Sequence, residues 1–102
     1  MFTIDGKEYE IEYSQKRIEL IENTLKRSVM DIVSNSSAMM TLRELKSFVA
    51  YALKQTGATA FVNPTLGTQI AEKLLEENGY STLLGMVIEA IERDCGFFFR
   101  TV

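Results

Sequence analysis

Residues 2–13 alternate between apolar and polar side chains, which is the period of a β-strand with one buried face. The pair Asp5-Gly6 interrupts the alternation and favours the two-residue type I′ turn of a β-hairpin. Pairing Ile4 with Lys7 across this turn brings the apolar side chains onto one face. These side chains are Phe2, Ile4, Tyr9, Ile11 and Tyr13. Because a lone hairpin is only marginally stable in water, this face must pack against helices or against another chain.

After the hairpin, apolar residues recur at steps of three and four, which predicts helices. Ser14 can cap a first helix that ends near Ser34, and Thr41 with Glu44 forms the capping-box pattern that opens a second. Gly57 predicts the end of this second helix. The buried stripes are Ile18, Ile21, Leu25, Val29 and Ile32 in the first helix, and Leu42, Leu45, Val49, Ala52 and Leu53 in the second, with Phe48 at the edge.

Two further helices follow a short connection. Asn63-Pro64 supplies a cap and a first-turn proline for a third helix, which ends at Gly79. Ser81 can cap a fourth helix, which stops at Cys95 and is apolar over more than half of its circumference, as is typical of a central helix. The apolar residues are Leu66, Ile70 and Leu74 in the third helix, and Leu83, Leu84, Met86, Val87, Ile88, Ala90 and Ile91 in the fourth.

A length of 102 residues, with 46% hydrophobic and 25% charged residues, is typical of a single globular domain. Together with the periodicity, this composition predicts a mainly α fold. An N-terminal β-hairpin is followed by about four helices, and residues 1–102 form one compact domain.

The residue inventory offers no set of side chains for catalysis. The chain has no histidine, which excludes histidine-based triads, Cys-His dyads and histidine-containing zinc sites. Cys95 has no base to activate it, and we interpret it as a packing residue. Gly67 and Gly85 lie inside predicted helices, where they favour close helix packing or mark a weak point. No phosphate-binding or calcium-binding loop is present, so we predict a protein that is not an enzyme and has no cofactor or metal.

Charge and hydropathy limit the partners and the compartment. Eleven Lys and Arg against fourteen Asp and Glu give a net charge of −3, and no basic block exceeds a pair such as Lys26-Arg27, so nucleic acid is not a predicted partner. The longest apolar run, residues 48–53, is far shorter than the roughly 20 residues of a membrane span. With one cysteine and no signal-peptide pattern, a cytoplasmic location is predicted.

Several apolar side chains lie off the predicted stripes and favour contact with other protein chains. Met39 and Met40 lie in the loop between the first two predicted helices, where they either contact a partner or fold back onto the core. The candidate protein-binding residues are Leu20, Met30, Met39, Met40, Tyr51, Phe97, Phe98 and Phe99. Together with the apolar face of the hairpin, these residues also predict self-association.

The chain opens with the hairpin FTIDGKEYEI at residues 2–11, continues at once into a helix from Ser14, adds three helices and closes with Gly96-Phe97-Phe98. This layout resembles the tail assembly chaperones of long-tailed bacteriophages over nearly all 102 residues. The resemblance implies a non-enzymatic protein of the bacterial host cytoplasm. Such a protein coats the phage tape measure protein while tail-tube protein assembles around it, and it is absent from the finished virion.

Two other functions agree with the same sequence. One is a structural joint protein that stays in a finished phage particle and uses the hairpin and helices as a permanent contact. The other is a small helical regulatory protein that binds nucleic acid, although the acidic charge balance argues against it.

Overall fold

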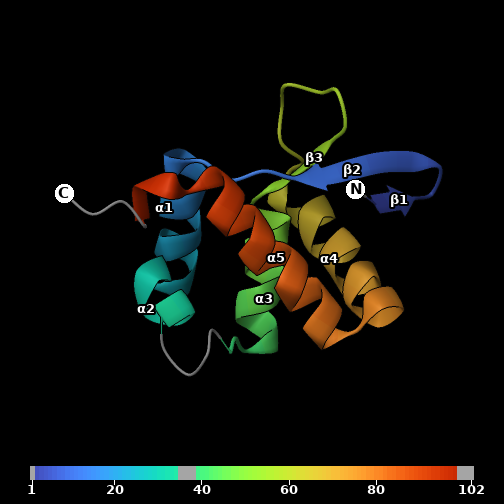
Figure 1. The fold of residues 1–102 in the computed structure, drawn as a ribbon. Coiled ribbons are helices and arrows are strands. Elements are labelled where there is room, and N and C mark those ends of the chain that lie inside the picture. The colour runs from blue at the N-terminus through green and yellow to red at the C-terminus, as the bar shows by residue number, and fades with distance from the viewer. Residues whose placement is uncertain (1, 35–38, 99–102) are drawn as a thin grey trace.

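Five α-helices and a three-stranded sheet are found among residues 2–34 and 39–98, which the computed structural model describes (Figure 1). The helices are α1 (Gln15–Leu25), α2 (Val29–Ser34), α3 (Leu42–Ala50), α4 (Pro64–Asn78) and α5 (Tyr80–Asp94), and a 3-10 turn, η2 (Gly96–Phe98), follows α5. The strands are β1 (Phe2–Ile4), β2 (Lys7–Ile11) and β3 (Leu53–Gln55), in the order β1-β2-β3. The predicted mainly α fold with an N-terminal hairpin is confirmed.

The hairpin has the predicted register. Phe2 pairs with Tyr9 and Ile4 pairs with Lys7. Asp5 has a φ of 50° and Gly6 a φ of 79°, as a type I′ turn requires. Four of the five side chains on the predicted apolar face are buried, and Phe2 packs against the core while partly exposed. The buried ones are Ile4, Tyr9, Ile11 and Tyr13.

The first predicted helix is wrong in its length, because the chain breaks after Leu25. Ser14 does cap α1, and its side chain accepts the Arg17 amide. Lys26 is left-handed, with a φ of 56°, which ends the helix. The Glu22 carboxylate accepts the Val29 amide at 2.9 Å and so joins the start of α2 to α1. Apolar residues of both helices reach the same core, which is why the spacing resembled one helix. Residues 35–38 of the predicted loop lie outside the described residues.

The second predicted helix is also shorter than expected, and a third strand follows it. The capping box of Thr41 and Glu44 is present, but α3 ends at Ala50 and not near Gly57. The hairpin competes for this segment, because the Ala52 carbonyl accepts the Glu12 amide at 2.9 Å and β3 pairs with β2. An apolar run serves a buried helix or a buried strand equally well, so periodicity did not separate them.

The core also corrects three positions of the predicted stripes. Phe48, expected at the edge of the core, is fully buried, and its carbonyl accepts the Tyr13 hydroxyl at 2.7 Å. Leu42 and Leu66, expected to be buried, are 54% and 41% exposed. Both lie in the first turn of a helix, and the core is built from the turns that follow.

A glycine sets the distance between α3 and α4. A Cβ atom on Gly67 would lie 2.6 Å from the Ala50 carbonyl oxygen, so no larger residue fits without a backbone shift. The predicted close approach of two helices is confirmed here. Asn63 caps α4 as expected, whereas α5 begins at Tyr80 and not at a Ser81 cap. Gly79, with a φ of 83°, makes the sharp turn that starts α5 early.

Candidate functional site

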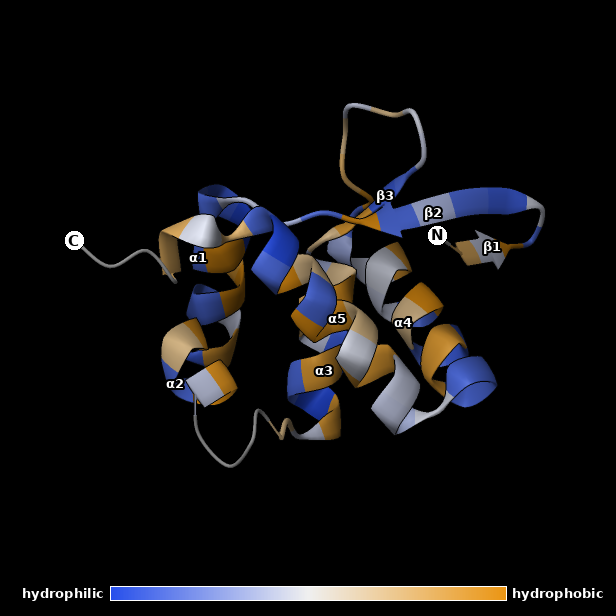
Figure 2. Cartoon of the chain, viewed as in Figure 1, coloured by the Kyte–Doolittle hydropathy of each residue, from blue (hydrophilic) through white to orange (hydrophobic). Residues whose placement is uncertain are grey.

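Helix α5 is covered by the core on one side only. Its fully covered residues are Leu83, Val87, Ala90 and Ile91, whereas Leu84, Met86 and Ile88 are only partly buried. In Figure 2, α5 crosses in front of α3 and shows apolar as well as polar segments toward the viewer. The expectation of a central helix was therefore wrong in part, because some of its apolar stripe reaches the surface.

A groove of about 520 Å³ follows this outward side of α5, and we call it the Met39 groove. It is lined by Met39, Tyr80, Ser81, Leu84, Gly85, Ile88, Glu89 and Glu92. Met39 comes from the segment before α3 and is 58% exposed. An apolar depression thus lies between two segments that are far apart in sequence.

The Tyr80 hydroxyl holds the segment that carries Met39. It accepts the Met40 amide at 2.9 Å and donates to the Met40 carbonyl. Met40 itself is 5% exposed and belongs to the core. Of the two open interpretations, packing onto the core therefore holds for Met40, while Met39 stays at the surface. These two hydrogen bonds, which we call the Tyr80 clamp, fix the backbone at Met40 and leave the flexible Met39 side chain beside α5.

The charged residues of the Met39 groove are both acidic. Glu89 and Glu92 are three residues apart on α5 and lie near each other on the helix surface. No ion pair to either carboxylate is found among residues 2–34 and 39–98. One end of the groove is therefore negatively charged and open to cationic groups.

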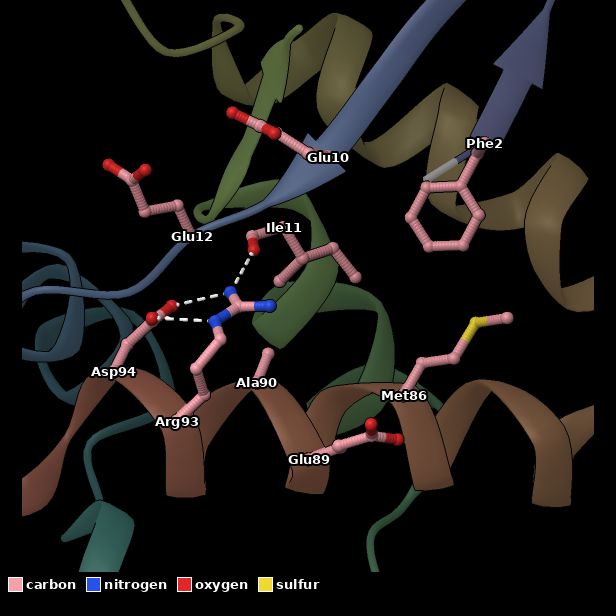
Figure 3. A pocket seen from close by; sticks show the side chains of 9 residues that line it. All are labelled: Phe2, Glu10, Ile11, Glu12, Met86, Glu89, Ala90, Arg93 and Asp94. Atoms are coloured by element: carbon pink, nitrogen blue, oxygen red, sulfur yellow. Dashed lines mark hydrogen bonds and ion pairs between the residues drawn. The ribbon is translucent and has the colours of Figure 1, made fainter.

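A second depression, of about 490 Å³, lies between the hairpin and the other side of α5 (Figure 3). Its lining residues are Phe2, Glu10, Ile11, Glu12, Met86, Glu89, Ala90, Arg93 and Asp94. Figure 3 shows Phe2 and Met86 facing each other across it, with Arg93 and Asp94 at the opposite end. Glu89 lines both depressions, so α5 forms the ridge between them.

Arg93 and Asp94 form a structural clasp at the end of α5. Arg93 donates to both oxygens of Asp94, at 2.8 and 2.7 Å, and to the Ile11 carbonyl at 2.7 Å. The Asp94 carboxylate also accepts the Tyr13 amide at 3.0 Å. Partial burial favours a higher pKa for Asp94, but the hydrogen bonds from Arg93 and Tyr13 outweigh it, so the pKa is lowered. The polar groups here hold α5 to the end of β2.

Cys95 packs in the core, as the sequence predicted, and is fully buried. Burial, with a smaller effect of the Asp94 charge, raises the pKa of the thiol to about 11. The thiol is therefore protonated near neutral pH, and a neutral thiol is a poor nucleophile and a poor metal ligand.

The described members of the predicted protein-binding set lie on several different elements. Met39 is the described member of the set that lines the Met39 groove. Phe97 is 42% exposed, and the centroid of its ring lies 4.8 Å from that of Phe98. Phe98 is partly buried and packs against the core. The half-buried members are Leu20 on α1, Met30 on α2 and Tyr51 at the end of α3. Phe99 lies outside the described residues.

Sequence reasoning missed Leu84, Gly85 and Ile88 as groove residues. It assigned both aliphatic residues to a buried stripe and Gly85 to packing or a weak point. The width of the stripe was the available signal, since neighbouring helices seldom cover more than half of a surface helix.

Comparisons with protein-family models, curated proteins and solved structures find no match. Within residues 2–34 and 39–98, no cluster of three or more Cys, Asp or Glu residues could hold a metal ion. Over the same residues, no helix has the length and apolar character needed to cross a membrane.

Proposed function

We propose that the protein is a non-enzymatic chaperone that binds another protein chain. As the resemblance in sequence implies, its client is a phage tape measure protein during assembly of the tail tube in the host cytoplasm. The single observation that carries this proposal is the Met39 groove, where exposed and half-buried apolar side chains lie beside two carboxylates that have no ion pair within residues 2–34 and 39–98.

The composition of the groove supports a protein client. Met39 has an unbranched side chain that adapts to different partners, and Leu84 and Ile88 are one helical turn apart on α5. An apolar stripe bordered by charged residues is the surface that an amphipathic segment recognises.

Exchange of Met39 tests the proposal directly. Co-expression with the tape measure protein of the same genome, followed by affinity capture, measures client binding. Met39→Ser should reduce capture by about tenfold, because it removes an adaptable apolar contact from the groove. Circular dichroism and the thermal midpoint should change little, since Met39 is 58% exposed.

Leu66→Ser is the matched control, because Leu66 is also an exposed apolar residue but lies on α4, outside the groove. Equal capture by the Met39 and Leu66 variants would place client binding elsewhere. Absence of any capture by the unchanged protein would contradict the chaperone function. Mass spectrometry of purified particles separates the structural alternative, since a joint protein would be present in a fixed copy number.

A further inference from the structure

Two glycines lie inside helices, and the fold accounts for only one of them. Glycine lowers helix stability at such positions. Gly67 is required, because a Cβ atom there would collide with the backbone of Ala50. Gly85 is exposed, and a Cβ atom there would meet nothing within 4 Å among the described residues. Gly85 lines the Met39 groove, so its missing side chain leaves a notch on this surface of α5.

The groove suits a helix lying along α5. The lining residues of α5 run from Tyr80 to Glu92, which corresponds to about 18 Å of helix. The backbone groups of α5 are paired within the helix, so this wall offers no strand edge for an extended partner. A partner helix satisfies its own backbone, and a glycine notch lets the two helices pack closely.

The acidic residues of the groove indicate the charge of the partner. Glu89 and Glu92 have no ion pair among the described residues, and the described lining contains no basic residue. By contrast, the carboxylates of Glu10 on β2 and of Glu12 just after it lie 3.8 and 3.2 Å from the ammonium group of Lys54. Lysine or arginine on a partner would complement the carboxylates of α5, and glutamate would be repelled.

From these observations we infer that the Met39 groove receives an amphipathic α-helix of another protein. The helix approaches α5 most closely at Gly85 and carries lysine or arginine beside its apolar stripe. The inference rests on the proposed function and specifies the chemistry of the client segment.

Two synthetic peptides of about 18 residues, long enough to form helix in isolation, test the inference. Both carry the same stripe of leucine and alanine, and one has lysine beside the stripe where the other has glutamate. Fluorescence anisotropy with the full chain should give at least about tenfold tighter binding of the lysine peptide at low salt.

Filling the notch should weaken binding of the lysine peptide. Gly85→Gln adds a long side chain with good helix propensity and no charge, and should reduce affinity by about tenfold or more. Thr82→Gln places the same side chain at an exposed position of α5 outside the groove lining, and should leave affinity unchanged. Gly85→Ala adds only a Cβ atom and should give a smaller loss, which keeps the test valid if Gly85→Gln fails to fold.

Two double variants test whether the carboxylates of the groove are needed for the preference for lysine. The double variant Glu89→Gln and Glu92→Gln should remove most of the preference for the lysine peptide. The double variant Glu76→Gln and Glu77→Gln makes the same charge change on exposed residues of α4 and should preserve it.

Three results from peptide binding and sedimentation would overturn the inference. The first is a folded Gly85→Gln variant that binds the lysine peptide as tightly as the unchanged protein. The second is equal affinity for both peptides. The third is a dimer in sedimentation that disappears in Gly85→Gln, because the occupant would then be a second copy of this chain.

Capture of tape measure protein that is unaffected by Gly85→Gln contradicts the inference alone, whereas peptide binding without such capture contradicts the proposed client alone.

Discussion

A single hydroxyl group separates the roles of two adjacent methionines. Tyr80 bonds to both backbone groups of Met40, whose side chain enters the core, and Met39 is left at the surface. Neighbouring residues of an irregular segment point in different directions, so fixing one of them determines where the other lies. A sequence shows the pair Met39-Met40 but not the clamp, because Tyr80 lies 40 residues further along the chain.

The two helical glycines should respond in opposite ways to the same substitution. Gly85→Ala should stabilise the protein by about 0.5–1 kcal/mol, because it removes the cost of glycine in a helix and meets no neighbour. Gly67→Ala should destabilise it by about 1–3 kcal/mol, because the new methyl group overpacks the contact with Ala50. Urea denaturation measures both changes in the free energy of unfolding, and the m-value should stay the same in both variants. A loss of stability in Gly85→Ala would show that Gly85 is needed by the fold itself.

At the scale of elements, the sequence predicted turns and helix caps better than the lengths of the helices and strands. The hairpin turn at Asp5-Gly6 and the caps at Ser14, Thr41 and Asn63 were correct, because each depends on a few neighbouring residues. The strand β3 and the exposed side of α5 were missed, because each depends on segments distant in sequence. The break at Lys26 was missed because the apolar spacing continues across it, since residues of α1 and α2 reach the same core.

The candidate site, too, could be predicted from the sequence only as far as it depends on neighbouring residues. Met39 was predicted from its own local context, since a flexible apolar residue in a loop is an adaptable contact. The groove opposite Met39 depends on how much of α5 the other helices cover. That coverage is set by tertiary packing, which the period of apolar residues along α5 does not contain.

The clasp at the end of α5 predicts a dependence of stability on pH. The pKa of Asp94 is lowered in the folded state, so its contribution is present above the unfolded value of about 4. It is lost as the pH falls through the lower folded value. The stability difference between the unchanged protein and Asp94→Asn should therefore be constant near neutral pH and shrink under acid conditions.

Urea denaturation from pH 7 to pH 3 measures this difference. Asp5→Asn is the control, because Asp5 pairs with Lys73 at 3.2 Å but its side chain is 80% exposed. Exposed pairs contribute little to stability, so this variant should follow the unchanged protein closely over the whole range. A constant difference between Asp94→Asn and the unchanged protein down to pH 3 would mean that the clasp does not depend on the Asp94 charge.

At the scale of the whole molecule, the Met39 groove and the β1 edge of the sheet are separate surfaces, because no residue of the sheet lines the groove. The radius of gyration is 12.9 Å, as expected for a compact domain of this length. Both depressions border α5, whereas β1 forms one edge of the sheet (Figure 1). A client helix in the Met39 groove would therefore leave β1 available for a contact between copies of the chain.

The strand pairing shows which groups that edge offers. The Glu8 carbonyl accepts the Thr56 amide at 2.9 Å, so the backbone of Glu8 faces β3. Thr3 pairs with Glu8 on the opposite side, which means that the amide and carbonyl of Thr3 point away from β2. Thr3 is exposed, and a strand edge of this kind can pair with the same edge of another copy.

We therefore predict that the protein self-associates through β1. Light scattering at high micromolar concentration should give a mass above 11.6 kDa for the unchanged protein. Thr3→Pro removes the outward amide and should shift the mass toward the monomer, because proline is tolerated at an edge position but cannot donate to a second strand. Thr3→Val keeps the amide and should keep the larger mass. A strict monomer for the unchanged protein would contradict self-association, and an oligomer unaffected by Thr3→Pro would move the contact to another surface.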